Sequence, residues 1–166
     1  DVAVAVDAAW TWYDVDFARG LLDRWNPLRL GWIEDPVAAD DLATLRRLRD
    51  VSSAPIAVGD EVSRAETLIS AARSGLVDIL RVDLTCAGGF SRLQEIADAA
   101  QTLTLSPHVY PEIHVHAALG VASAGPVEMF PSPSPWDTTW EFVKPVDPEL
   151  DNGTRVVSGP KSAGLG

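Results

Sequence analysis

The chain has 166 residues, of which 46% are hydrophobic and 22% charged, and it carries a formal net charge of -11. This balance is typical of a globular domain and excludes a disordered chain, while the negative charge argues against nucleic acid and anionic membranes as partners. No apolar run approaches the ~20 residues of a membrane span, and the single cysteine, Cys86, cannot form an intramolecular disulfide, so we expect a cytoplasmic protein.

Apolar, β-rich runs alternate along the chain with amphipathic helical patterns. The predicted strands cover residues 2–7, 30–35, 55–60, 77–83, 102–108 and 126–130. The predicted helices cover residues 14–25, 40–50, 64–75, 93–101 and 111–125. This strict alternation predicts an α/β fold with a parallel sheet, either an open doubly wound sheet or a TIM-type (β/α) barrel.

Each predicted strand ends in an ionisable residue or contains one. In chain order these residues are Asp7, Glu34, Asp60, Asp83, His108 and Glu128. In a barrel the catalytic residues lie at the C-terminal ends of the strands. A ring of such residues around one cleft requires one for each βα unit, as found here. The position of these residues therefore favours the barrel.

Three of these acids, Asp7, Glu34 and Asp60, would lie at the ends of neighbouring strands. Carboxylates that meet in a partly buried site repel one another unless a cation lies among them. A ligand set made only of oxygen suits a hard ion, with Mg²⁺ first. Each acid alone also has a structural interpretation, such as a helix cap or a turn. The metal site is favoured because all three acids stand at the same position, the end of successive predicted strands.

All three histidines lie in the stretch SPHVYPEIHVH, as His108, His114 and His116. On a helix, residues two apart point about 200° away from each other, so His114 and His116 cannot both join His108. The helix is expected to begin at Pro111, which carries the later pair away from the strand end. We therefore predict that His108 alone does chemistry and that the other two histidines pack.

The motifs VAVDAAW, WIEDP, VGDE, RVDLTCAGG, SPH and PVEMF, in this order, resemble the enolase superfamily in its mandelate racemase and muconate lactonising enzyme branch. The resemblance covers nearly the whole chain. It implies that Asp7, Glu34 and Asp60 are the Mg²⁺ ligands. It further implies that His108 and Asp83 form the His-Asp pair of the mandelate racemase subgroup. Related subgroups usually carry a lysine where Asp83 stands.

The resemblance also implies that Glu128 is a protonated acid that donates a hydrogen bond to the substrate carboxylate. Its alternative interpretation is an acid at the edge of the core, paired with a lysine or arginine. Two features depart from the family pattern: Ala9 stands where the family often has Asn, and the second barrel strand with its Lys-x-Lys motif has no counterpart here.

The resemblance thus implies a fragment that supplies strands three to eight of the family barrel. Residues 1–145 would form the partial barrel domain. Residues 146–166 would form a hairpin-like return segment that packs on an N-terminal capping domain absent from this chain. We expect the full-length protein to be a homo-oligomer and the isolated chain to have little activity.

By this resemblance, the protein abstracts the proton α to a carboxylate in a Mg²⁺-dependent reaction that passes through an enediolate. The first expectation is a hydro-lyase that dehydrates an acid sugar, an aldonate or aldarate, to a 2-keto-3-deoxy acid. The neutral imidazole of His108 suits the role of base. Two alternatives stay open: a racemase or epimerase of a 2-hydroxy acid, and a non-catalytic barrel module used in assembly.

Overall fold

The computed structural model describes residues 3–130, 134–135, 139–143, 145–146 and 148–165. Five parallel strands form one sheet in which the spatial order follows the chain order: β1 (Val6–Asp7), β2 (Ile33–Glu34), β3 (Ile56–Val58), β4 (Ile79–Val82) and β5 (Thr104–Pro107). The strands are followed in turn by α1 (Val15–Trp25), α2 (Leu42–Arg49), α3 (Ala65–Arg73), α4 (Phe90–Ala99) and α5 (Pro111–Gly120).

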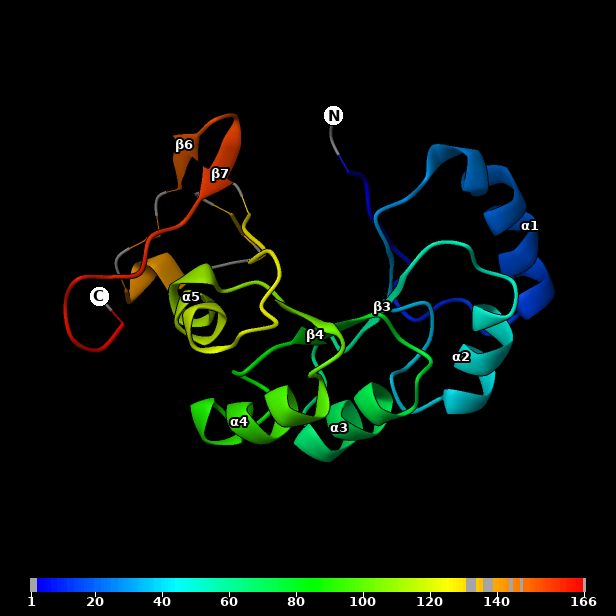
Figure 1. Cartoon of the computed structure of the whole chain (residues 1–166), viewed down its shortest axis with the longest axis horizontal. Coiled ribbons are helices and arrows are strands. Elements are labelled where there is room, and N and C mark those ends of the chain that lie inside the picture. Colours follow the sequence, from blue (N-terminus) through cyan, green and yellow to red (C-terminus); the bar gives the residue numbers. More distant parts are fainter. Residues whose placement is uncertain (1–2, 131–133, 136–138, 144, 147, 166) are drawn as a thin grey trace.

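The helices lie in an arc along the outer side of the sheet, from α1 at the right of Figure 1 through α3 and α4 to α5 at the left. A doubly wound sheet has helices on both faces and a reversal in its strand order, whereas a barrel keeps sequential order and one outer ring of helices. The predicted α/β fold with a parallel sheet is therefore confirmed, and its arrangement is that of a partial TIM-type barrel.

An apolar layer between the sheet and the helices holds these elements together. Its buried members include Leu22, Leu45, Leu48, Ile56, Val58, Leu68, Leu80, Val82, Ile96 and Leu105. The starts of α1 and α2 are fixed by side-chain caps: Asp14 accepts from the backbone N–H of Asp16 and Phe17, and Asp41 accepts from the backbone N–H of Thr44. Because side chains alternate along a strand, the residues between the apolar ones face the inner side, where the buried polar groups lie.

The predicted strand at 126–130 is wrong. Beside β5 the chain makes one isolated parallel bridge, and the N–H of Gly125 donates to the Leu105 carbonyl at 2.7 Å. Pro126 has no N–H to continue the ladder, and its carbonyl accepts from the Ser106 hydroxyl at 2.8 Å instead of from a backbone donor. The segment still runs next to β5, so Glu128 reaches the inner side.

A short hairpin follows, formed by β6 (Glu149–Asp151) and β7 (Thr154–Val156), which pair antiparallel (Figure 1). Its two-residue turn is Asn152 and Gly153, with φ of +48° and +82°, the positive values that a type I′ turn needs. The predicted hairpin is confirmed, while its packing on a capping domain stays a prediction. None of the described helices has the length and apolarity to cross a bilayer.

Candidate functional site

The inner side of the sheet is organised around a buried arginine that the sequence analysis did not single out. The Nη2 atom of Arg81 lies 3.2 Å from Oε1 of Glu34, and its Nε lies 3.2 Å from Oδ1 of Asp60. Arg81 points inward from β4 because its neighbours Leu80 and Val82 pack in the apolar layer. The ends of β2, β3 and β4 thus bring two carboxylates and one guanidinium together.

The remaining donors of Arg81 are also used. Its Nη1 donates to Oγ of Ser106 at 3.1 Å and to the Pro107 carbonyl at 3.4 Å, and its Nη2 donates to Glu128. A guanidinium is permanently charged and is buried only when its donors are satisfied. A sequence signal existed: an arginine in the middle of an apolar strand, two residues before Asp83.

Burial changes the protonation of the two central acids. It raises the pKa of Glu34 to about 7 and that of Asp60 to about 6, although the Arg81 charge opposes both shifts. The Nε1–H of Trp32 also donates to Oε2 of Glu34 at 2.6 Å. Burial is thus the main cause of both raised pKa values, and the Arg81 charge offsets it only in part.

Asp7, the third predicted metal ligand, lies on the strand next to Glu34. It is the register partner of Glu34 across β1 and β2. Its side chain is exposed, however, and its Oδ1 accepts from the Ala9 N–H at 2.8 Å. Within the part of the chain that the structure describes, no group of three or more His, Cys, Asp or Glu side chains is already arranged as a metal site.

The donor chemistry nevertheless fits a divalent cation. Glu34, Asp60 and Glu128 are three acids that face the single guanidinium of Arg81. In their ionised forms they exceed its charge by two, which one divalent cation would balance. The available atoms are carboxylate oxygens, which suit Mg²⁺.

Asp35 is a second residue of the site that the sequence pattern did not reveal. Its two carboxylate oxygens accept from the backbone N–H groups of Gly59 and Asp60, each at 2.9 Å. Burial raises the pKa of Asp35 to about 7, and these two hydrogen bonds oppose the shift. Asp35 therefore fixes the turn that carries Asp60.

His108 lies at the end of β5 with its Nδ1 atom 3.2 Å from Oδ1 of Asp60. Burial lowers the pKa of His108, and the Arg81 charge lowers it further, so the neutral imidazole is favoured. The ring opens on a cavity of about 320 Å³, whose lining residues are Glu61, Asp83, His108, Val109, Tyr110 and Phe130. This volume is in the range of about 300 to 1,000 Å³ of small-molecule sites.

Asp83 lines the same cavity, yet its hydrogen bonds go elsewhere. Its Oδ1 accepts from the backbone N–H and the hydroxyl of Thr85, at 2.8 and 2.6 Å, and its Oδ2 accepts from the Cys86 thiol at 3.4 Å. Asp83 and His108 therefore share a cavity, while the nearest acid to the His108 ring is Asp60. The His108-Asp83 pair of the sequence analysis stays a prediction.

His114 is completely buried and bonded to backbone groups on both sides of the ring. Its Nε2 accepts from the Leu84 N–H at 2.9 Å, so Nδ1 carries the proton that bonds the Val109 carbonyl at 2.6 Å. His116 lies instead with its ring edge-on to Phe90, with centroids 6.4 Å apart. The histidines of the described chain thus do not form one metal site, and His114 joins the turns after β4 and β5.

Glu128 is paired with arginine, as in the alternative interpretation of this residue. Its Oε2 accepts both from Nη2 of Arg81 and from the Val109 N–H, the latter at 3.0 Å. This oxygen acts as an acceptor in the structure, and the role of proton donor to a substrate carboxylate stays a prediction.

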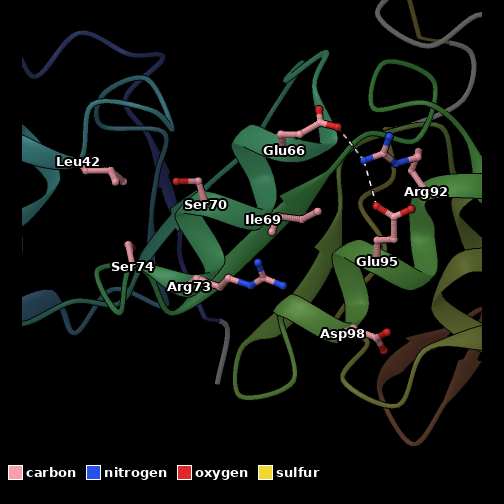
Figure 2. A pocket seen from close by; sticks show the side chains of 9 residues that line it. All are labelled: Leu42, Glu66, Ile69, Ser70, Arg73, Ser74, Arg92, Glu95 and Asp98. Atoms are coloured by element: carbon pink, nitrogen blue, oxygen red, sulfur yellow. Dashed lines mark hydrogen bonds and ion pairs between the residues drawn. The ribbon is translucent and has the colours of Figure 1, made fainter.

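A wider hollow of about 850 Å³ lies on the outer side of the sheet, along α3 and α4 (Figure 2). Arg92 pairs there with Glu66 at 2.8 Å and with Glu95 at 3.0 Å. These side chains come from helix surfaces and are partly or fully exposed, so they form a solvated ion-pair network of little energetic value. The candidate site is therefore the inner one.

Comparison with known proteins identifies the family of the chain. The model for the family described as enolase C-terminal domain-like matches residues 1–166. D-galactarolactone cycloisomerase of Agrobacterium fabrum is 32% identical over 180 residues, which cover 100% of this chain and 46% of that protein. L-talarate dehydratase from Polaromonas sp. JS666, crystallised with Mg and L-glucarate, is 30% identical with a TM-score of 0.69, over 76% of this chain and 36% of that chain.

A mandelate racemase/muconate lactonizing enzyme from a marine actinobacterium, in complex with magnesium, shares the fold with a TM-score of 0.79 at 24% identity, over 95% of this chain and 45% of that chain. The present chain thus spans less than half the length of each of these proteins. Since the family match extends over every residue, the chain belongs to the enolase C-terminal domain-like family.

Proposed function

We propose that the protein abstracts the proton α to the carboxylate of an acid sugar with the help of Mg²⁺, and that it dehydrates this substrate to a 2-keto-3-deoxy acid. The observation that carries the proposal is the position of His108, a partly buried imidazole whose neutral form is favoured, 3.2 Å from Asp60 and at the edge of a cavity. The similarity to L-talarate dehydratase supports an acid sugar as the substrate class.

Glu34 and Asp60 would hold the cation, with Asp7 as a third ligand once its carboxylate turns away from the Ala9 N–H. Bound Mg²⁺ would supply positive charge beside the substrate carboxylate, where negative charge develops as the α proton leaves. Arg81 and Asp35 keep the two carboxylates at the strand ends.

Proton transfer is assigned to Nε2 of His108, because Nδ1 is buried beside Asp60. The neutral ring takes the α proton, and the C–H electron pair moves toward the carboxylate to give an enediolate. The acids around the ring, Asp83 and Glu128, favour the imidazolium that results. This imidazolium can return its proton to the departing β-hydroxyl, which leaves as water, and the enol product tautomerises to the 2-keto acid.

A second candidate is the cycloisomerisation of an acid-sugar lactone. The specific observation in its favour is the 32% identity to D-galactarolactone cycloisomerase, which extends over the whole chain. Both candidates begin with removal of a proton α to a carbonyl group, so the same residues would serve, and the substrate decides between them.

The test uses the intact protein, Mg²⁺, and a panel of aldonic acids, aldaric acids and their lactones in D₂O. Dehydration is detected as 2-keto acid, lactone conversion by NMR, and α-proton abstraction by deuterium incorporation. We expect 2-keto product from at least one aldarate or aldonate, and none from the His108→Asn variant. If neither product nor deuterium exchange is found for any compound, the proposal is wrong.

A further inference from the structure

We propose that Arg81 is the internal counter-ion of the candidate metal site: it holds Glu34 and Asp60 in place without a cation and weakens cation binding through its own charge. This inference rests on the proposed function, since it concerns the same site. It assigns a role to a residue that neither takes nor gives the proton in the transfer described above.

The first argument is burial. The Arg81 side chain is 2% exposed, and those of Glu34 and Asp60 are each 9% exposed. A buried charge with no partner is strongly destabilising, so the guanidinium and the carboxylates each need the other when no cation is present. Arg81 thus stabilises the site in its cation-free form.

The second argument is geometry. Arg81 contacts one oxygen of each acid, Oε1 of Glu34 and Oδ1 of Asp60. A divalent ion held by both acids would either use their other oxygens beside the guanidinium or displace the guanidinium from these two. The Ser106 hydroxyl and the Pro107 carbonyl offer acceptors that retain Arg81 on the β5 side when this happens.

The third argument is charge. A positive charge within a few ångströms of a divalent ion opposes its binding, and the low dielectric of a buried site strengthens the repulsion. Lysine keeps the charge but lacks the planar fork of donors, whereas glutamine keeps hydrogen bonding and lacks the charge. The two substitutions therefore separate charge from hydrogen bonding at this position.

The experiment measures the Kd of the intact protein for Mn²⁺ by electron paramagnetic resonance of the free ion, and for Mg²⁺ by titration calorimetry. Thermal unfolding is followed with and without each cation. We expect Arg81→Gln to lower the apo Tm and to tighten Mn²⁺ binding by at least about tenfold, because the repelling charge is gone. Arg81→Lys should keep a Kd near that of the wild type.

Arg49→Gln is the matched control. Arg49 pairs with Asp78 at the opposite end of β4, so its loss should lower the Tm and leave the cation Kd unchanged. If Arg81→Gln binds Mn²⁺ with the wild-type Kd or more weakly, the inference is overturned and the proposed function stands. If the wild type binds neither cation, the proposed function is overturned and this inference with it.

Discussion

The carboxylate of Asp35 accepts a hydrogen bond from the backbone N–H of Asp60 at 2.9 Å, so an acid at the end of β2 fixes an acid at the end of β3. The second oxygen of Asp35 binds the N–H of Gly59. Gly59 has a φ of +132°, and a Cβ there would lie 2.1 Å from the Arg81 carbonyl. The turn at Gly59 and Asp60 therefore packs against the β4 backbone on one side and is hydrogen-bonded to Asp35 on the other.

Asp35→Asn should destabilise the protein and reduce its activity. The amide keeps one acceptor oxygen but points an NH₂ group at a second N–H, and a buried donor left unpaired costs about 1–3 kcal/mol. A displaced Asp60 should also lower kcat/KM by about 100-fold, as small misplacements of catalytic groups do. Urea unfolding and the acid-sugar assay measure the two effects.

Asp14→Asn is the control for this substitution. Asp14 also accepts from two backbone N–H groups, but it does so as an exposed helix cap, where Asn serves about as well. We expect its stability and activity to stay near those of the wild type. Equal effects of the two substitutions would show that Asp35 has no special role.

His108→Asn should remove the catalytic base without unfolding the protein. Loss of a positioned acid/base group typically lowers kcat by about 10² to 10⁴-fold. Since His108 is not a proposed metal ligand, the Kd for Mn²⁺ should change little. His116→Asn is the control on the following helix, and it should retain activity. A His108→Asn variant as active as the wild type would exclude His108 as the base.

His114 should make stability depend on pH. Burial lowers the pKa of His114, and the neighbouring charge of Asp83 and the bond to Val109 oppose the shift only in part. An unfolded histidine has a pKa of about 6.5, so the unfolded chain takes up this proton first as the pH falls. The contribution of neutral His114 is full above about pH 6.5 and is lost as the pH falls toward its lowered folded value.

The measurement is urea unfolding of the intact protein at a series of pH values from neutral to mildly acidic. His114→Gln keeps an acceptor for the Leu84 N–H and cannot titrate, so its free energy of unfolding should fall less steeply with decreasing pH than that of the wild type. If the slopes of His114→Gln and the wild type coincide, His114 does not titrate on unfolding.

Glu112→Ala should release the chain that follows the barrel strands. Glu112 is 4% exposed, and its carboxylate accepts from the Thr139 hydroxyl at 2.8 Å and the Val146 N–H at 3.1 Å. Without these bonds we expect faster hydrogen exchange at Val146 and faster proteolysis after residue 130. The exposed Glu141→Ala is the control, and protection at Val146 equal to that of the wild type would contradict the prediction.

Much of the fold followed from local patterns. The five βα units were predicted because apolar runs alternate with helical periods, and a sheet buried against helices enforces both patterns. Helix ends were less accurate: α4 begins at Phe90, directly after two glycines with positive φ, and α5 ends at Gly120. The strand expected at 126–130 was wrong because β-rich composition does not reveal that Pro126 interrupts the ladder.

The site was predictable only in part. Acids in phase with the strand repeat could be named from the sequence, and the structure brings Glu34 and Asp60 together. Asp35 was missed because an acid before a proline looks ordinary, and Arg81 was missed because its place in an apolar strand does not reveal its partners. Their roles depend on contacts 21 to 47 residues away in the chain, which periodicity does not report.

The strand order of the sheet equals the order in which the ribosome makes the strands. Each βα unit can pack on the exposed strand edge of the unit before it. The contacts between strands are therefore mostly between units that are adjacent in the chain. Arg81 pairs with Glu34 and Asp60 from the two strands that precede β4 in the chain, and with Glu128 from the segment after β5. A chain that has docked β4 thus already holds two acid partners for the buried guanidinium.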